Sequence, residues 1–263
     1  MAYLYEMHLH TSQGSACGRS TGAEHARFYH ALGYRGVFIT DHFFHGNTAV
    51  PRGIPWQEYV QRFCQGYEDA KAEGDRIGLH VFFGLEENFN GDEYLIYGLN
   101  PKFLLDHPEM EHWSRAQQLE AVHQAGGCVI QAHPFRDRGY IQQVLLGRQF
   151  ADGIEVINSC NNPQNNICAL RYGREFGLPM IVGSDNHSHE WAEENKENLS
   201  ALSLDRPLES DQDLVRMILN KEKIGLHYHQ KHLEAAPDAP QKPAFWLDDR
   251  EIPYPTARDW LAE

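Results

Sequence analysis

The side chains in this sequence that are best able to do chemistry are seven potential metal ligands, which fall into five short clusters. They are His8, His10, His42, Glu86, His133, Asp185 and His187. Nearly every cluster closes a short apolar run of the kind that forms a buried β-strand. A mixed set of imidazole and carboxylate donors suits Zn, Mn or Fe better than Mg, which prefers oxygen ligands and retained water. The spacing therefore predicts a metalloenzyme.

In two of the clusters one segment could supply two ligands. Side chains alternate faces along a strand, so His8 and His10 project to the same side, and so do Asp185 and His187 if their segment is extended. A single His-x-His pair is weak evidence, because the chain contains three of them and such pairs also occur on strands that bind no metal. The prediction of a metal site therefore depends on the other clusters as well.

The other clusters place their ligands at strand ends. Pro134 biases His133 toward an extended conformation and tends to end regular strand pairing. Glu86 follows directly on the apolar run 79–85. Side chains at the carboxyl ends of strands point into the region that α/β barrels use for catalysis. We therefore expect one shared metal site rather than unrelated polar groups in the core or on the surface.

Strand and helix patterns alternate along most of the chain. Capping residues, glycine stops and helical periodicity indicate the helices, and short apolar runs indicate the strands. The expected strands cover residues 3–10, 36–40, 79–85, 93–99, 128–132, 153–157 and 180–182, and the expected helices cover 21–33, 55–76, 114–126 and 162–177. Asn90-Gly91-Asp92 indicates a hairpin between two of these strands. The alternation favours a parallel barrel with helices outside, and the 263 residues are enough for one such barrel.

We expect residues 1–232 to form this barrel and residues 233–263 to form a C-terminal extension. A helix over 214–219 and a short strand over 223–228 would complete the first part. Beyond residue 233 the sequence is rich in proline, which indicates an extended segment packed on the barrel or trailing from it. One catalytic domain is the simplest arrangement.

Composition limits the class of partner and the compartment. The formal net charge of −14 argues against a general affinity for long nucleic acids or anionic membranes. The five cysteines form no Cys-x-x-Cys pair, so they indicate neither a disulfide framework nor a zinc knuckle, and a reducing cytoplasm fits best. No signal peptide or membrane-spanning apolar run is recognisable. The sequence gives no indication of the oligomeric state.

The ordered motifs resemble those of the PHP (polymerase and histidinol phosphatase) superfamily. The matching motifs are HLHT at 8–11, TDH at 40–42, GLE at 84–86, AHP at 132–134 and GSDNH at 183–187, which span most of the chain. The resemblance implies an α/β fold of the distorted (β/α)7 TIM-like barrel type. It also implies two or three divalent metal ions, Zn, Mn or Fe, at the open end of the barrel and hydrolysis of phosphate esters.

The resemblance further implies how the ligands divide among the ions. The first ion would take four ligands, namely His8, His10, Glu86 and Asp185. Glu86 would bridge to a second ion that His133 also binds. A third ion would take His42 and His187.

At two positions this chain departs from the family pattern. Many relatives place another histidine shortly after His-x-His, where Cys17 is the nearest strong donor of this chain. A thiolate could serve there if a metal lowers its pKa, although a lone cysteine in such a loop is also compatible with an unliganded thiol. A further family histidine on the second ion has no clear match, with Asn100 and His107 as the nearest candidates, and both are more typical of loop residues.

Besides the ligands Glu86 and His42, three residues are candidates for a catalytic role. Asp41 precedes His42 and is most simply an acceptor that orients a ligand imidazole, or alternatively a group that exchanges the catalytic proton. Arg136 and Arg19 lie on loops expected at the barrel mouth. Each could clamp a phosphate in a bidentate way, or face solvent.

The predicted function is hydrolysis of a small-molecule phosphomonoester by a metal-bridging hydroxide. Histidinol phosphate is one candidate substrate, but no residue selects it. One alternative is a nucleotide phosphatase or short-oligonucleotide exonuclease, because the family also contains nucleases. A third interpretation is a catalytically degenerate metal-binding regulatory module, against which the retention of all seven main ligand candidates argues.

Overall fold

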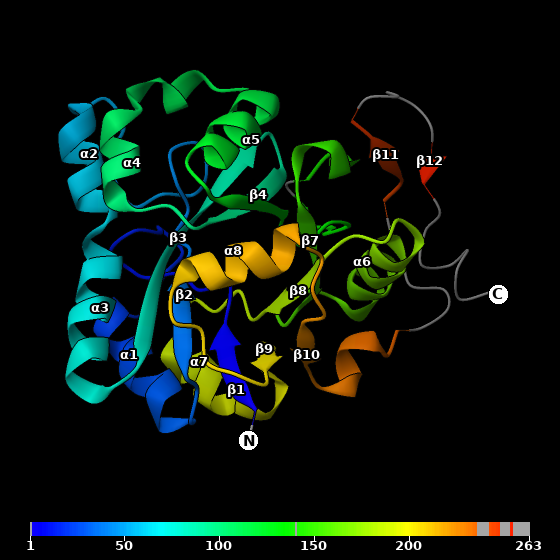
Figure 1. The fold of residues 1–263 in the computed structure, drawn as a ribbon. Coiled ribbons are helices and arrows are strands. Elements are labelled where there is room, and N and C mark those ends of the chain that lie inside the picture. The colour runs from blue at the N-terminus through cyan, green and yellow to red at the C-terminus, as the bar shows by residue number, and fades with distance from the viewer. Residues whose placement is uncertain (1, 140, 236–241, 248–252, 255–263) are drawn as a thin grey trace.

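A curved nine-stranded sheet forms the centre of the molecule. The computed structural model describes residues 2–139, 141–235, 242–247 and 253–254. The sheet has the strand order β10-β9-β1-β2-β3-β4-β5-β7-β8. Its strands are β1 (Tyr3–Glu6), β2 (Gly36–Ile39), β3 (His80–Phe89), β4 (Asp92–Tyr97), β5 (Cys128–Gln131), β7 (Gly153–Asn158), β8 (Met180–Gly183), β9 (Ala201–Leu204) and β10 (Gly225–His227). Strand β8 also contacts β9 and β10, so the sheet nearly closes into a barrel (Figure 1).

The sheet is parallel over most of its width but not throughout. Strands β1, β2 and β3 pair in parallel, as do β5, β7 and β8. Strand β4 is antiparallel to both of its neighbours, and β9 is antiparallel to β1 and to β10. The antiparallel β4 agrees with the expected hairpin, whereas the antiparallel pairs of β9, a strand that the sequence pattern did not indicate, depart from the expected parallel barrel.

The hairpin between β3 and β4 is confirmed. Phe89 pairs with Asp92, which leaves Asn90 and Gly91 as the two turn residues. Their φ angles are 59° and 111°. Two successive positive φ angles are typical of the tight hairpin turns that Asn-Gly favours, because glycine has no Cβ and asparagine tolerates the left-handed region.

Helices lie mainly outside the sheet, as expected (Figure 1). The α-helices are α1 (Gly22–Ala31), α2 (Trp56–Phe63), α3 (Gln65–Ile77), α4 (Pro101–Asp106), α5 (Arg115–Gln124), α6 (Pro163–Glu175), α7 (His189–Glu194) and α8 (Asp211–Leu219). The 3₁₀ helices are η1 (Pro108–His112), η2 (Arg148–Phe150), η3 (Lys196–Asn198) and η4 (Gln230–Leu233). The capping boxes expected at Thr21 and Ser114 begin α1 and α5.

The helix expected over residues 55–76 is divided into α2 and α3. The division falls at Cys64, which is the C-cap of one helix and the N-cap of the other. At the start of α3, Gly66 packs so closely on Thr11 that an added Cβ would lie 2.0 Å from the Thr11 hydroxyl. Aromatic periodicity alone could not locate the break, because it continues from Tyr59 to Tyr67 across it.

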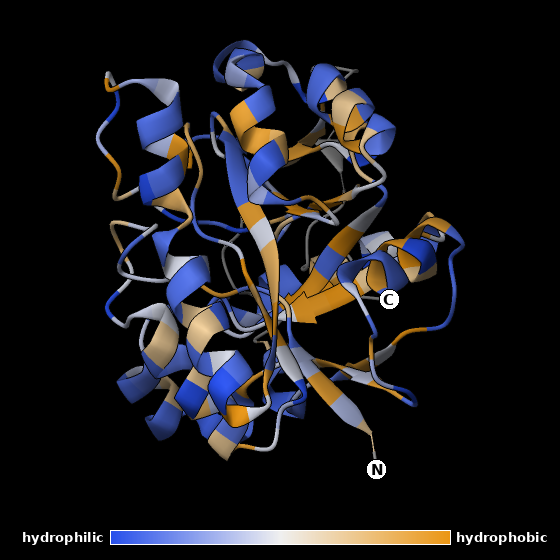
Figure 2. Ribbon diagram, turned by 60° about the vertical axis from the view of Figure 1, so that its left-hand side comes forward, coloured by the Kyte–Doolittle hydropathy of each residue, from blue (hydrophilic) through white to orange (hydrophobic). Residues whose placement is uncertain are grey.

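The apolar faces of strands and helices meet in the interior. The central strands in Figure 2 are largely hydrophobic, whereas the surrounding helices alternate hydrophobic and hydrophilic stretches. The largest core cluster includes Tyr5, Phe38 and Tyr97, which are fully buried. Burial of such surface stabilises the fold by about 25 cal/mol per Å². This core holds the strand ends that carry the polar site.

The C-terminal part contributes a small second sheet in the order β12-β11-β6. Strand β11 (Ala244–Trp246) pairs in parallel with β6 (Val144–Leu146), and β12 (Pro253–Tyr254) pairs with β11. Residues 244–246 therefore pack on the barrel. The rest of the expected extension, residues 236–241, 248–252 and 255–263, lies outside the described residues, and the division at residue 232 stays a prediction.

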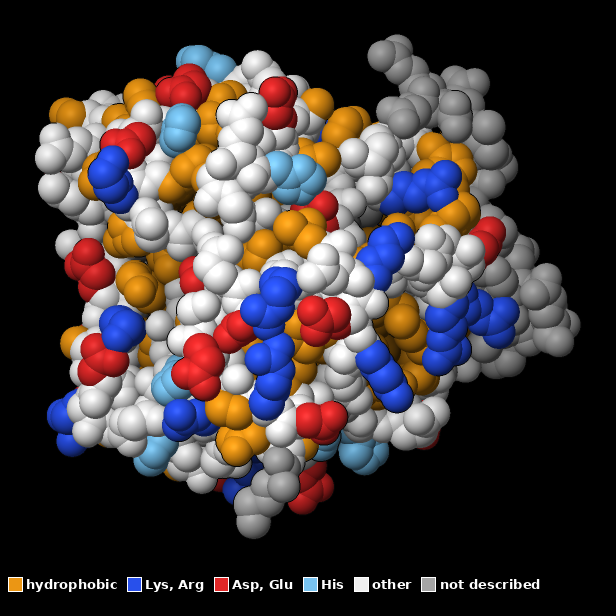
Figure 3. All heavy atoms as spheres, in the orientation of Figure 1, with side chains coloured by type: hydrophobic (Ala, Val, Ile, Leu, Met, Phe, Trp, Pro, Cys, Tyr) orange, Lys and Arg blue, Asp and Glu red, His pale blue; other side chains and the backbone are white. Residues whose placement is uncertain are grey.

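The surface carries charges of both signs despite the net charge of −14. Lys and Arg side chains gather in the right half of Figure 3, over the region of α6, β10 and the adjacent end of α8. In the described part of the chain, no helix combines the length and apolar character that a membrane span requires.

Candidate metal centre

Loops and strand ends from across the sheet converge at one end of the barrel and carry all seven predicted ligands. His8 and His10 follow β1, His42 follows β2, Glu86 lies in β3, His133 follows β5, and Asp185 and His187 follow β8. Backbone pairing continues past the strands here, because His10 N donates to Asn186 O at 2.9 Å and Phe43 N donates to Glu86 O at 2.8 Å. These bonds fix the positions of segments that are far apart in the sequence.

Glu86 lies between four imidazoles. Its Oε1 is 3.3 Å from His8 Nε2 and 3.0 Å from His133 Nε2. Its Oε2 is 2.8 Å from His42 Nδ1 and 3.5 Å from His10 Nε2. Burial raises the pKa of Glu86, but His8 and His42 lower it by more, so that its pKa lies well below the usual range. Glu86 is therefore an ionised carboxylate with imidazoles beside both oxygens.

Asp185 faces the same cluster from the loop after β8. Its Oδ1 is 3.1 Å from His10 Nε2 and 3.5 Å from His8 Nε2, while Oδ2 pairs with the Arg136 guanidinium. Burial raises the pKa of Asp185, but Arg136 and His8 lower it by more, to well below the usual range. The φ angle of Asp185 is 55°, so this segment is not extended. Nevertheless, His187 Nδ1 lies 3.7 Å from Asp185 Oδ1.

Four buried ligand atoms in the cluster have other ligand atoms as close polar neighbours, and none is aligned as a hydrogen bond requires within the described part of the chain. They are His8 Nε2, His10 Nε2, His42 Nδ1 and Glu86 Oε2. An unsatisfied buried polar atom costs about 1–3 kcal/mol, so four that face one another are unfavourable without a further partner. A divalent cation satisfies such lone pairs. The residues present therefore fit metal binding.

The ligand atoms also fall into groups of the right size for separate ions. Within each group the atoms lie within 4.8 Å of one another. The groups are His8/His10/Asp185, His8/Glu86/His133, His10/His42/His187 and His42/Glu86/Glu93. The first three overlap the ligand sets that the family resemblance implies, although the second also contains His8, the third also contains His10, and the first lacks Glu86. The fourth includes Glu93, which the sequence pattern did not indicate.

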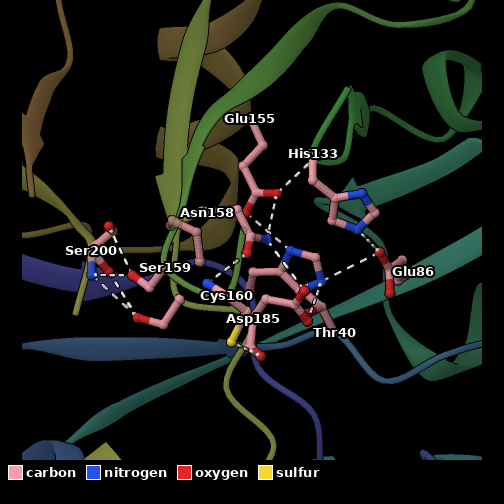
Figure 4. A network of polar contacts seen from close by, with 12 residues as sticks. Thr40, Glu86, His133, Glu155, Asn158, Ser159, Cys160, Asp185 and Ser200 are labelled. Carbon is pink, nitrogen blue, oxygen red and sulfur yellow. Dashed lines mark hydrogen bonds and ion pairs between the residues drawn. The ribbon is translucent and has the colours of Figure 1, made fainter. Parts of the chain in front are cut away.

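Glu155 is a second residue that the sequence pattern did not indicate. It lies in β7 with Oε1 3.0 Å from His8 Nδ1, while its Oε2 accepts from His133 N and from Asn158 Nδ2, each at 3.0 Å (Figure 4). Asn158 Nδ2 also lies 3.3 Å from Asp185 Oδ2. A carboxylate bonded to the far nitrogen of a ligand histidine fixes the tautomer and orientation of the ring. The signal in the sequence was a lone acidic residue inside the apolar run 153–157.

Glu6, at the end of β1, holds the backbone of the site. Its Oε1 accepts from His8 N at 2.9 Å and Ser184 N at 2.8 Å, and Tyr29 donates to its Oε2 at 3.0 Å. Burial raises the pKa of Glu6 to about 7, although the hydrogen bonds from Ser184 and His8 oppose that rise. Glu6 thus ties the β1 cluster to the cluster after β8.

Asp41 does not contact a ligand imidazole directly. Its Oδ1 accepts from Thr11 N at 2.6 Å and Ser15 Oγ at 2.7 Å, and its Oδ2 accepts from Thr11 Oγ1 at 2.7 Å. Ser15 Oγ in turn lies 3.1 Å from His10 Nδ1 and accepts from His42 N at 2.9 Å. Asp41 is therefore linked to His10 and His42 through Ser15, and it is only 2% exposed.

Glu93 brings a second carboxylate to the side of the site where His133 lies. Its Oε2 is 3.5 Å from His133 Nε2, and Asn88 Nδ2 donates to its Oε1 at 2.9 Å. The two residues considered from the sequence for this side lie elsewhere. Asn100 caps α4, and His107 pairs with an exposed glutamate, Glu109.

Cys17 lies beside the candidate third site. Burial raises the pKa of the Cys17 thiol, but its interactions with His187 and His42 lower it by more, to about 6. The other cysteine near the site, Cys160, donates to Asp185 O at 3.5 Å, and burial raises its pKa to about 12. Of these two thiols, Cys17 is the one whose surroundings favour the thiolate on balance.

The ligands open onto a cavity of about 590 Å³. Its lining includes His42, Asp185 and His187 together with Arg136 and Arg138. Arg136 is 8% exposed, and Arg138 Nη2 donates to Cys160 O at 2.8 Å. Arg19, in contrast, lines a neighbouring hollow of about 280 Å³ with His187 and Trp191. The structure thus places Arg136 at the ligands and Arg19 at their margin.

Solved structures share this fold at low sequence identity. A two-domain protein from Bacteroides vulgatus, containing a predicted PHP-like metal-dependent phosphoesterase, has a TM-score of 0.64 at 14% identity over 88% of this chain and 66% of its own. A candidate metal-dependent phosphoesterase from Bifidobacterium adolescentis has a TM-score of 0.53 at 17% identity, over 82% and 96%. PsfC from Pseudomonas syringae has a TM-score of 0.57 at 13% identity, over 88% and 93%. No family model and no curated protein matches the sequence.

These similarities show the class of fold. The chain shares the α/β barrel of these solved structures, which confirms the fold class predicted from the motifs. The chain spans slightly less than two thirds of the first of these proteins, which has two domains. The chemistry of this chain therefore has to follow from its own residues.

Proposed function

We propose that this protein is a metal-dependent phosphoesterase that hydrolyses a small-molecule phosphomonoester. The observation that carries the proposal is the convergence of buried, unpaired donor atoms around Glu86 at the floor of a cavity that also contains arginines. Strand-end ligands of this kind point into the region where barrel enzymes do chemistry. The similarity to proteins named as metal-dependent phosphoesterases supports the same class.

The bound ions would supply charge neutralisation at the phosphate and an activated water. His8, His10, Glu86 and Asp185 would hold the first, Glu86 and His133 the second, and His42 with His187 the third. Zn, Mn and Fe all accept this mixture of imidazole and carboxylate donors.

The remaining residues of the cavity would bind and orient the substrate. Arg136 is held by Asp185 and by Asn161 Oδ1, 2.9 Å from its Nε, so the guanidinium is already fixed. A fixed guanidinium loses little side-chain entropy when it binds a phosphate oxygen. Arg138 lies further along the same loop, and Arg19 could contact a substrate group that extends past His187.

The size of the cavity favours a small substrate. A volume of about 590 Å³ lies within the range of ligand pockets, which is roughly 300–1,000 Å³. A sugar phosphate, histidinol phosphate or a mononucleotide would fit, whereas a long nucleic acid would need an extended positive groove.

The five free thiols support a cytoplasmic location, because reducing compartments keep cysteines unpaired.

A substrate panel tests the proposal. The protein, loaded with Mn or Zn, is assayed with p-nitrophenyl phosphate, bis-p-nitrophenyl phosphate and short oligonucleotides. We expect monoester turnover that the Glu86→Gln variant abolishes, because the amide cannot bridge two cations. Turnover of diesters alone would favour the nuclease alternative. No turnover in any metal-loaded sample would favour the regulatory module and overturn the proposal.

A further inference from the structure

We infer that the metal centre is chemically divided into an oxygen-rich half that favours manganese or iron and a sulfur-containing half that favours zinc. The oxygen-rich half consists of Glu86, Glu93 and His133. The sulfur-containing half consists of Cys17, His42 and His187. The inference rests on the proposed function and deepens it, because it assigns a metal preference to each part of the site.

The oxygen-rich half depends on the orientation of Glu93. Strand pairing places Glu93 opposite Asn88 across the β3–β4 hairpin, and Asn88 Nδ2 holds its Oε1 at 2.9 Å. Oε2 is left to face His133 Nε2 at 3.5 Å. One Glu93 oxygen also lies within 4.8 Å of ligand atoms of His42 and Glu86. Glu93 is 8% exposed, and a buried carboxylate directed at other ligands is placed to bind a cation.

The sulfur-containing half depends on the loop after His10. Backbone bonds fix this loop on both sides of Cys17, from Ala16 N to Asn47 O at 2.8 Å and from Arg19 N to His187 O at 2.7 Å. Cys17 lines the same cavity as His42 and His187. His42 is 8% exposed, and its ring lies within ligand distance of His10 and His187, of which His10 Nε2 is buried without an aligned hydrogen bond in the described part of the chain. The thiol therefore shares a cavity wall with one buried imidazole, His42, and one partly buried imidazole, His187.

The two donor sets differ in softness. Carboxylates suit manganese and other hard cations, whereas a thiolate with imidazoles suits zinc. His42 belongs to the sulfur-containing half, and its Nδ1 lies 2.8 Å from Glu86 Oε2 in the oxygen-rich half, so the two halves are adjacent. A protein loaded from a mixture of metals should therefore bind different metals in the two halves instead of filling every position with one.

Cobalt spectroscopy tests the sulfur-containing half. Protein stripped with chelator and reloaded with Co²⁺ should show a near-ultraviolet thiolate-to-cobalt charge-transfer band. We expect Cys17→Ser to lose the band and Cys160→Ser, a control in the same cavity, to retain it. Substoichiometric Zn²⁺ should remove the band, whereas excess Mn²⁺ should leave it. Cobalt bound without the band, or a band that survives Cys17→Ser, overturns this half of the inference.

Two further measurements cover the oxygen-rich half and the folding of the variants. Elemental analysis after Mn²⁺ loading should show about one ion fewer in Glu93→Gln, and no loss in Glu87→Gln, a control with a buried carboxyl on the facing strand. Equal manganese in Glu93→Gln and wild type overturns the assignment of Glu93. A third measurement needs no substitution. In the wild-type protein, bound Zn²⁺ should slow the alkylation of Cys17 by iodoacetamide. An equal alkylation rate with and without Zn²⁺ contradicts ligation by Cys17. If no metal is retained at all, the proposed function itself fails.

Discussion

At the scale of single residues, the site depends on how Glu86 is held. Imidazole nitrogens lie at 2.8–3.5 Å from its two oxygens, and the surroundings keep the carboxyl ionised. Glu86 is therefore placed to bridge cations, as the family resemblance implied. Around this centre, Glu155, Glu6 and Asp41 hold the ligands without belonging to them.

Glu155 should control metal affinity through the orientation of His8. Its Oε1 lies 3.0 Å from His8 Nδ1, and replacement by glutamine removes the negative charge that makes the imidazole a stronger ligand. Loss of such a partner typically weakens metal binding by about 10–100-fold. Titration of the stripped Glu155→Gln protein with Zn²⁺ in a competing chelator measures the change. A Glu87→Gln control should bind normally, and an unaltered affinity in Glu155→Gln would refute the positioning role.

His25 should make the protein less stable in mild acid. Burial lowers the pKa of His25 to about 3 from the usual 6.5, although a bond to His10 O opposes the shift. The unfolded chain binds this proton below pH 6.5 and the folded chain does not, so stability is present above pH 6.5 and is lost as the pH falls toward 3. The loss from His25 at pH 5 is about 2 kcal/mol.

Urea unfolding at pH 7.5 and pH 5, with chelator present throughout, measures this effect. In His25→Gln the side chain stays neutral at both values, so we expect its unfolding free energy to fall less than that of the wild type. The comparison cancels the other histidines, which both proteins share. Equal acid destabilisation of the two proteins would show that His25 is not the cause.

The structure brings the seven candidate ligands together as expected for a local reason, whereas the residues that support them were missed for a non-local one. Histidines that end apolar runs are visible in the sequence, so the order of residues alone predicts that His8, His42 and His133 lie at strand ends. Glu155 and Glu93 lie inside expected strands, and their roles depend on which strands become neighbours. Strand order brings β4 and β7 to opposite sides of β5, and no local pattern encodes that order.

At the scale of elements, the same difference explains which parts of the fold could be predicted. The Asn90-Gly91 turn and the capping residues Thr21 and Ser114 act over a few positions, and these predictions are confirmed. Strand β9 was not expected, and its antiparallel direction is set by pairing with β1, nearly 200 positions earlier in the chain. Alternating strands and helices gave no indication of that reversal.

The C-terminal segment should influence substrate binding through Lys242. Its Nζ lies 2.9 Å from Asp137 Oδ1 and donates to Arg138 O at 2.7 Å and to Ile141 O. These contacts hold the loop that carries Arg136 and Arg138 into the cavity. We expect Lys242→Ala to raise KM for p-nitrophenyl phosphate several-fold with little change in kcat, because the loop binds substrate and the ligands are untouched.

Lys223→Ala serves as the control for this prediction, since Lys223 is an exposed lysine lining a different hollow. Steady-state kinetics of both variants at saturating metal separate KM from kcat. A fall in kcat with unchanged KM in Lys242→Ala would mean that the contact supports the metal ligands instead of the substrate loop.

At the scale of the whole molecule, the barrel buries carboxylates and imidazoles from distant segments so that their ligand atoms face one another. Binding of metal to the folded state alone should therefore stabilise the entire chain. At a metal concentration 100 times Kd the gain is about 2.7 kcal/mol for one site. For a protein of this size we expect chelation to lower Tm by about 5–10 °C.

Differential scanning fluorimetry with and without chelator, followed by readdition of Mn²⁺ or Zn²⁺, checks this linkage. The Glu86→Gln variant should show a smaller shift, because it retains fewer of the ligand contacts. The metal content of the untreated sample is verified first. If chelator then leaves the Tm of the wild-type protein unchanged, metal binding does not stabilise the fold.

The most direct test of the metal centre is an anomalous difference map from crystals of protein purified without chelator, recorded at the manganese, iron and zinc edges. We predict at least two peaks within ligand distance of Glu86, one also contacting His8 and Asp185 and another contacting His133. A third peak beside His42 and His187 would show that Cys17 or another donor completes that position. Metal-replete crystals without any peak at Glu86 would contradict a metal centre bridged by this carboxylate.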